Sequence, residues 1–144
     1  DNRRKLAFIL FDNEEKGLRG SKAYAKAHPA VKESGFVVNL DCVGNGEHVL
    51  LISSENARAA QGYAALTQGM ESAKGRQLHI FPLETSVGNS DHRSFRTSSV
   101  VYACSRMKGI GYYCDRIHTK KDTVCEQANL DYLAEGLSAF AAML

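Results

Sequence analysis

Residues 8–21 read FILFDNEEKGLRGS: an apolar run ends in acidic residues, passes through a glycine-containing turn and continues into a helical pattern. A largely apolar run of this length is typical of a strand buried on both faces of a parallel sheet. We expect that strand at residues 5–11. In α/β sheets, functional side chains gather at the carboxyl ends of strands. The stretch therefore predicts that Glu14 and Glu15 lie at the rim of a sheet.

Strand-like and helical patterns alternate along the rest of the chain. Further strands are expected at residues 36–43, 48–53, 77–82 and 99–105, and the longest helices at residues 55–74 and 129–144. The turn Gly44-Asn45-Gly46 predicts that the first two of these strands form a hairpin. Residues 107–116 are expected to form an irregular loop. The alternation predicts one α/β domain over residues 1–144, with a mostly parallel mixed sheet sandwiched by helices.

Composition and charge narrow the classes of function. The net charge of +2 gives no reason to expect nucleic acid or a membrane as a partner, and no apolar run approaches the ~18 residues of a membrane span. The four cysteines contain no Cys-x-x-Cys pair, which argues against a zinc knuckle or a thioredoxin-type motif, and their spacing does not choose a pairing. We expect them to be reduced, which favours a cytoplasmic location, with secretion as the alternative.

A third acid and a histidine are candidates to join the two glutamates. Asp41 interrupts an apolar strand, where a carboxylate is costly unless it is paired or bound to a metal. His118 follows a loop, and imidazole together with carboxylates suits zinc. Each has an ordinary alternative: a solvated acidic turn before a helix for the glutamates, a salt bridge or turn for Asp41, and a plain loop histidine for His118. A hydrolytic metal site is the leading hypothesis.

Two other polar segments remain ambiguous on sequence alone. Ser90-Asp91-His92 could supply a nucleophile or ligands, but a helix cap by Ser90 is the more ordinary interpretation. The chain has no Gly-x-Ser-x-Gly elbow, which argues against a serine hydrolase. Asp122 either steadies the His118 loop by hydrogen bonding or forms a plain Asx turn.

Taken together, four segments resemble the zinc aminopeptidases of the M28 family, which are co-catalytic di-zinc exopeptidases. The matching segments span nearly the whole chain in family order and are residues 11–21, 39–44, 90–95 and 117–123. The resemblance implies a zinc-exopeptidase-like fold, one or two zinc ions, a peptide substrate and hydrolysis of N-terminal peptide bonds.

The resemblance also implies roles for individual residues. Glu14 is expected to be the general base, and Glu15 a zinc ligand on the same metal as His118. Asp41 is expected to bind the second zinc. The residues expected to line the substrate cleft are Ser90, Asp91 and His92.

One departure from the family pattern affects the expected activity. The family carries a His-x-Asp motif and a metal-bridging Asp before the Glu-Glu strand, and only ten residues precede the end of that strand here. We therefore expect the C-terminal part of a catalytic domain, lacking the N-terminal strands, with a reduced set of ligands and little activity alone. A truncated, non-catalytic module that assembles into a homo-oligomer through an exposed sheet edge is one alternative. A related amide hydrolase or glutaminyl cyclase is another.

Overall fold

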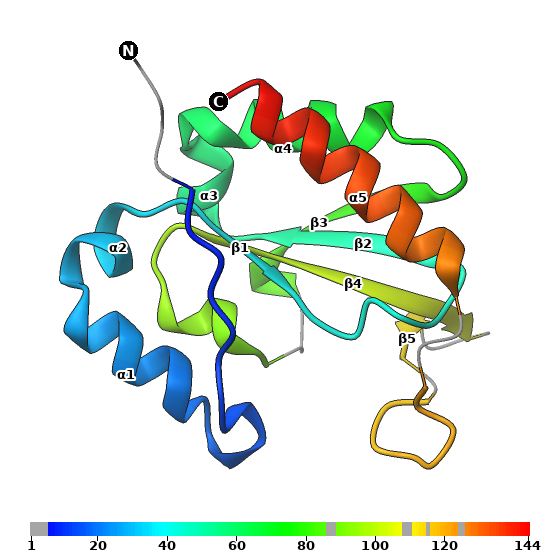
Figure 1. The fold of residues 1–144 in the computed structure, drawn as a ribbon, viewed down its shortest axis with the longest axis horizontal. Helices are drawn as coiled ribbons and strands as arrows, with labels where there is room; N and C mark the ends of the chain where they lie inside the picture. Colours follow the sequence, from blue (N-terminus) through cyan, green and yellow to red (C-terminus); the bar gives the residue numbers. More distant parts are fainter. Residues whose placement is uncertain (1–5, 86–88, 108–110, 115, 124–125) are drawn as a thin grey trace.

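A central mixed sheet organises the computed structural model, which describes residues 6–85, 89–107, 111–114, 116–123 and 126–144 (Figure 1). Its strands are β1 (Val37–Leu40), β2 (His48–Ser53), β3 (Gln77–Pro82), β4 (Ser98–Met107) and β5 (Gly111–Tyr113). The strand order is β1-β4-β2-β3, and β5 pairs with β4. The β1–β4 and β2–β3 pairs are parallel, and the β2–β4 and β4–β5 pairs are antiparallel. The predicted mixed α/β fold is thus confirmed.

The predicted hairpin between the first two strands is wrong, because β4 lies between them. Val38 of β1 is in register with Ser99, and Ile52 of β2 is in register with Val100. Val100 and Val101 are fully buried, so β4 takes the central position that its apolar residues require. The predicted loop at residues 107–116 is also wrong in part, since it contains the short strand β5.

Helices lie on both sides of this sheet, with α4 and α5 along one side and α1 and α2 on the other (Figure 1). The helices are α1 (Arg19–Ala27), α2 (Pro29–Ser34), α3 (Glu55–Ala59), α4 (Gln61–Ser72) and α5 (Gln127–Ala142), and the short 3-10 turns are η1 (Glu14–Lys16), η2 (Leu83–Thr85) and η3 (Asp91–Ser94). The single helix predicted at residues 55–74 is divided, because Ala60 is extended at φ −76° and ψ 145°. Among the described residues, no helix is long and apolar enough to cross a membrane.

The main core lies between the sheet and the α4–α5 pair. Its fully buried members include Val49 and Leu51 from β2 and Leu66 and Met70 from α4. Tyr132 of α5 is 1% exposed, and its hydroxyl donates a hydrogen bond to the Met70 carbonyl. This core joins the central strands of the sheet to the α4–α5 pair.

The strand predicted at residues 5–11 is absent from the described part of the chain. Residues 6–11 have no regular secondary structure, and Leu6, Phe8 and Leu10 are 54%, 97% and 101% exposed. No described strand lies beside this segment to take its backbone hydrogen bonds, and a strand needs such a partner. The segment runs as an extended chain to Phe11, where packing against the domain begins (Figure 1).

Candidate functional site

Aromatic packing and one glycine position the acidic segment. The Phe11 ring lies 5.8 Å from the Tyr24 ring and 5.9 Å from the Phe95 ring. The Gly20 amide donates to the Asp12 carbonyl at 3.0 Å, and a Cβ at Gly20 would collide with that same oxygen. Only glycine allows this approach, which brings the start of α1 against the residues that lead into η1.

Residues with a left-handed backbone conformation flank η1, the turn that carries the two glutamates. Asn13 has φ 56° and Leu18 has φ 60°, and η1 lies between them. Non-glycine residues rarely adopt this conformation, and such strain tends to occur at functional sites. Cys42 at φ 51° and His118 at φ 60° share it. These two residues line the pocket that the glutamates of η1 also line.

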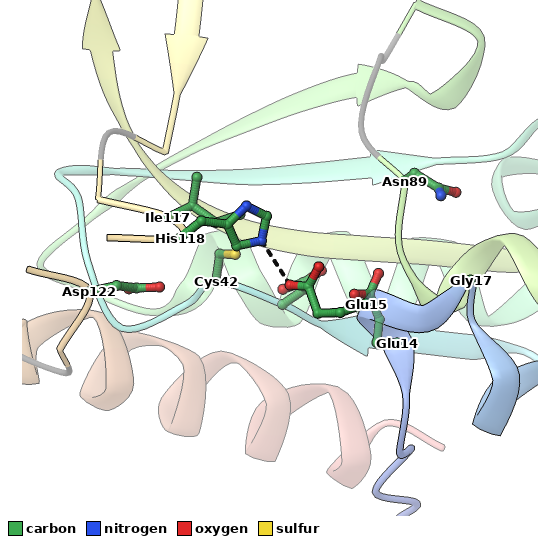
Figure 2. A pocket seen from close by; sticks show the side chains of 9 residues that line it. Glu14, Glu15, Gly17, Cys42, Asn89, Ile117, His118 and Asp122 are labelled. Atoms are coloured by element: carbon green, nitrogen blue, oxygen red, sulfur yellow. Dashed lines mark hydrogen bonds and ion pairs between the residues drawn. The ribbon is translucent and has the colours of Figure 1, made fainter. Parts of the chain in front are cut away.

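A pocket of about 560 Å³ opens between these segments (Figure 2). It is lined by Glu14, Glu15, Gly17, Asp41, Cys42, Asn89, Ile117, His118 and Asp122. Across it, Glu15 Oε1 and His118 Nε2 lie 2.8 Å apart. The structure therefore brings together four residues that sequence reasoning selected: the two glutamates, Asp41 and His118.

Negative charge is concentrated in this pocket. Burial raises the pKa of Glu14, and the carboxylates of Glu15, Asp41 and Asp91 raise it further, while His118 acts in the opposite direction. Like charges at close range disfavour ionisation unless a cation compensates them. The pocket thus holds several carboxylates close to one histidine.

The number of donors is smaller than a closed metal cage requires. Within the described residues, no group of three or more His, Cys, Asp or Glu side chains is placed to hold a metal ion. Catalytic zinc usually has three protein ligands. The facing pair of Glu15 and His118 fits two ligands of one ion in atom type, and Asp41 supplies an oxygen in the same pocket. The residues present fit part of a metal site.

Ser90, Asp91 and His92 follow Asn89, which lines the pocket, and are buried, at 1%, 7% and 1% exposure. The Ser90 hydroxyl accepts a hydrogen bond from Asn39 Nδ2 at 2.7 Å and makes no side-chain cap on η3. Burial, aided by Arg93, lowers the pKa of His92 to about 4. Asp91 Oδ1 and both ring nitrogens of His92 have no hydrogen-bond partner within the described structure. Their expected place at a substrate cleft stays a prediction.

Asn45 fastens the loop that carries His118. Its amide donates to Asp122 Oδ1 at 3.2 Å, and its carbonyl oxygen accepts from Arg116 Nη1 at 3.2 Å. Asp122 thus steadies this loop, one of the two roles considered for it. Sequence reasoning missed Asn45 because the Gly-Asn-Gly segment indicates only a turn. It also missed Asn89, which has no sequence signal beyond its place before Ser90.

Of the cysteines, Cys42 is a free thiol. Cys125 and the side chain of Cys104 lie outside the described part of the structure.

Comparison with known proteins decides the family. The model of peptidase family M28 matches residues 1–141. The chain belongs to peptidase family M28. Two M28-like relatives are the vacuolar membrane proteases of Eremothecium gossypii, 30% identical over 125 residues, and of Candida glabrata, 28% identical over 126 residues. They match 84% and 85% of this chain. Membership supports a peptidase function, with peptides as the substrate class.

A solved structure carries the same fold. The aminopeptidase from Aneurinibacillus sp. strain AM-1 superposes with a TM-score of 0.58 at 22% identity, covering 92% of this chain and 31% of that one. This match confirms the predicted zinc-exopeptidase-like fold. The chain spans only 12% of the length of each vacuolar relative.

The predicted cytoplasmic location is contradicted by the same relatives. Their name places both of them at a vacuolar membrane. The cytoplasmic prediction rested on the expectation that the cysteines are reduced. The redox state of partly buried cysteines is a weak indicator of the cellular compartment.

Proposed function

We propose that this chain is part of a zinc-dependent aminopeptidase, which hydrolyses the first peptide bond of its substrates. The observation that carries the proposal is the 2.8 Å approach of Glu15 and His118 in a pocket that also contains Glu14 and Asp41. Family membership supports the hydrolase class, and the fold shared with an aminopeptidase agrees with the exopeptidase assignment.

In this proposal, different residues bind the metal and transfer the proton. Glu15 and His118 hold one zinc ion, and Asp41 contributes to a second. Zinc, when bound, polarises the scissile carbonyl and acidifies water. Glu14 accepts a proton from the attacking water and passes it to the leaving amine. A raised pKa suits that role, because a general base works best when its pKa approaches the working pH.

Further ligands come from other parts of a longer protein in this proposal. A catalytic zinc needs about three protein ligands, and the described residues offer no such group. Because the chain spans 12% of each vacuolar relative, other segments are available to complete the site. We place that longer protein at a vacuolar membrane, as the names of the relatives indicate.

Zinc titration of the 144-residue chain tests the metal part of the proposal. We expect weak zinc binding that falls at least about tenfold in Glu15→Gln, because removing a ligand or its support usually costs 10- to 100-fold in affinity. Glu47→Gln is the matched control, since Glu47 is exposed and does not line the pocket. Equal affinity in wild type and Glu15→Gln would contradict the assignment of this ligand.

A non-catalytic module that acts through assembly is the second candidate. The observation that favours it is the absence of a three-ligand group among the described side chains, together with the exposed apolar residues of the 6–11 segment. The same titration separates the two candidates, because this module has no reason to bind zinc through Glu15.

A further inference from the structure

Two histidines from neighbouring strands meet on the face of the sheet opposite the main core. His48 begins β2 and His79 lies in β3, and the two strands pair in parallel (Figure 1). Side chains alternate along a strand, so His48 shares its face with Leu50 and not with the core residue Val49. His79 is in register with Leu50. The facing ring nitrogens, His48 Nδ1 and His79 Nε2, lie 3.2 Å apart.

The spacing of the two rings is that of two ligands on one metal ion. Zn–N bonds of about 2.0–2.1 Å at a tetrahedral angle put the two nitrogens about 3.3 Å apart and the ring centres about 5.2 Å apart. The observed separations are 3.2 Å between the nitrogens and 5.1 Å between the ring centres. Both rings can therefore bind one ion after small rotations of their side chains. Each histidine is partly exposed, so an ion can reach them from solvent.

Tyr112 of β5 contacts both histidine rings. Its hydroxyl lies 3.1 Å from His79 Nδ1, and its ring centre lies 5.2 Å from that of His48 and 4.9 Å from that of His79. A histidine that binds a metal through one nitrogen usually donates the proton on its other nitrogen to a neighbouring acceptor. The Tyr112 oxygen is such an acceptor for His79 Nδ1. This hydrogen bond favours the tautomer in which His79 Nε2 keeps its lone pair for a metal.

We propose that His48 and His79 bind one zinc ion at a site outside the candidate pocket. Neutral imidazole suits zinc, and each bound ring carries its proton on the far nitrogen, Nε2 of His48 and Nδ1 of His79. Among the residues that the structure describes, no third His, Cys, Asp or Glu side chain joins the pair, so water completes the coordination and binding is weak. The ion ties β3, the last strand in the sheet order, to β2. Neither histidine lines the candidate pocket, and the proposal does not rest on the proposed function.

NMR of the 144-residue chain tests this site directly, because long-range proton–nitrogen correlations report on each ring nitrogen of each histidine. Zinc chloride is titrated into Glu15→Gln, in which the proposed zinc ligand of the pocket is replaced, in mildly alkaline buffer that keeps imidazole neutral. We expect zinc to shift the signals of His48 Nδ1 and His79 Nε2 together, along one shared saturation curve. The proton of His79 should reside on Nδ1 at saturation.

A titration that leaves both nitrogens unchanged, or that shifts only one of them, would overturn the proposal. Two variants in the same background sharpen the test. His48→Gln and His79→Gln should each weaken zinc binding at the remaining ring at least about tenfold, whereas the control His28→Gln, at an exposed position, should bind as its parent does. Undiminished affinity at the remaining ring would also count against the pair. Zinc at His118 in the wild type reports on the pocket separately, so the two proposals can fail independently.

Discussion

Glu14 and Glu15 are consecutive, yet the fold gives them different surroundings. Glu15 faces His118 at 2.8 Å, whereas burial and nearby carboxylates raise the pKa of Glu14. The 3-10 turn that carries both directs successive side chains about 120° apart. Asn13, which has a left-handed backbone conformation, directly precedes that turn. In the proposed mechanism this difference leaves Glu15 to face the metal and Glu14 to accept a proton.

The lowered pKa of His92 predicts how the free energy of unfolding depends on pH. Its pKa is about 4 in the folded chain and 6.5 in its unperturbed state, so only the unfolded state takes up this proton between those values. The contribution of neutral His92 to the free energy of unfolding is therefore fully present above pH 6.5 and is lost as the pH falls towards 4. The full difference between the two pKa values corresponds to about 3 kcal/mol. Thermal unfolding at pH 7.5 and pH 4.5 measures this loss.

His92→Leu should reduce the acid-induced drop in melting temperature. The substitution removes no hydrogen bond, because both ring nitrogens lack a partner within the described structure. His28→Gln is the control, since His28 is exposed at the end of α1 and its loss should not change the drop. An equal drop in wild type and His92→Leu would show that other groups cause the acid sensitivity.

At the scale of elements, α4 and α5 approach so closely that glycine is required at their contact. A Cβ on Gly69 would lie 2.7 Å from both the Gly136 carbonyl oxygen and the Phe140 nitrogen. Backbone atoms on the facing helix cannot yield as a flexible side chain would. The contact fixes how closely this helix pair covers the core around Met70 and Tyr132.

Gly69→Ala should therefore destabilise the chain, by about 1–3 kcal/mol as expected for overpacking. Helix propensity alone predicts the opposite sign, because alanine is favoured over glycine by about 1 kcal/mol inside a helix. Urea unfolding decides between the two effects. Gln68→Ala, at the exposed neighbouring position of α4, should not destabilise the chain. An unchanged or increased stability of Gly69→Ala would mean that the helices separate at little cost.

The elements also show what sequence patterns can and cannot predict. β2 and β3 have the predicted bounds, because each is a short segment rich in apolar residues that begins soon after a glycine turn. The hairpin prediction failed because a local turn signal says nothing about β4, which enters the sheet from far along the chain. The predicted strand at residues 5–11 has the right composition, but a strand also needs a neighbour, and composition does not supply one.

At the scale of the whole molecule, the pocket draws its lining from segments that are distant in sequence. Glu14 and Glu15 come before α1, Asp41 follows β1, and His118 lies beyond β5. The order of their motifs was enough to select these four residues. It was not enough to identify Asn45, which fastens the His118 loop through contacts between two turns.

The hydrolytic role of Glu14 can be tested most directly in the full-length gene product. Hydrolysis of an aminoacyl-anilide and zinc content are measured for wild type, Glu14→Gln and the control Glu47→Gln. We predict that kcat falls at least about 100-fold in Glu14→Gln, the usual effect of losing a general base, while zinc content stays at the wild-type level and Glu47→Gln keeps full activity. Hydrolysis by Glu14→Gln at the wild-type rate would contradict the assignment of Glu14 as the base and, with it, the proposed mechanism.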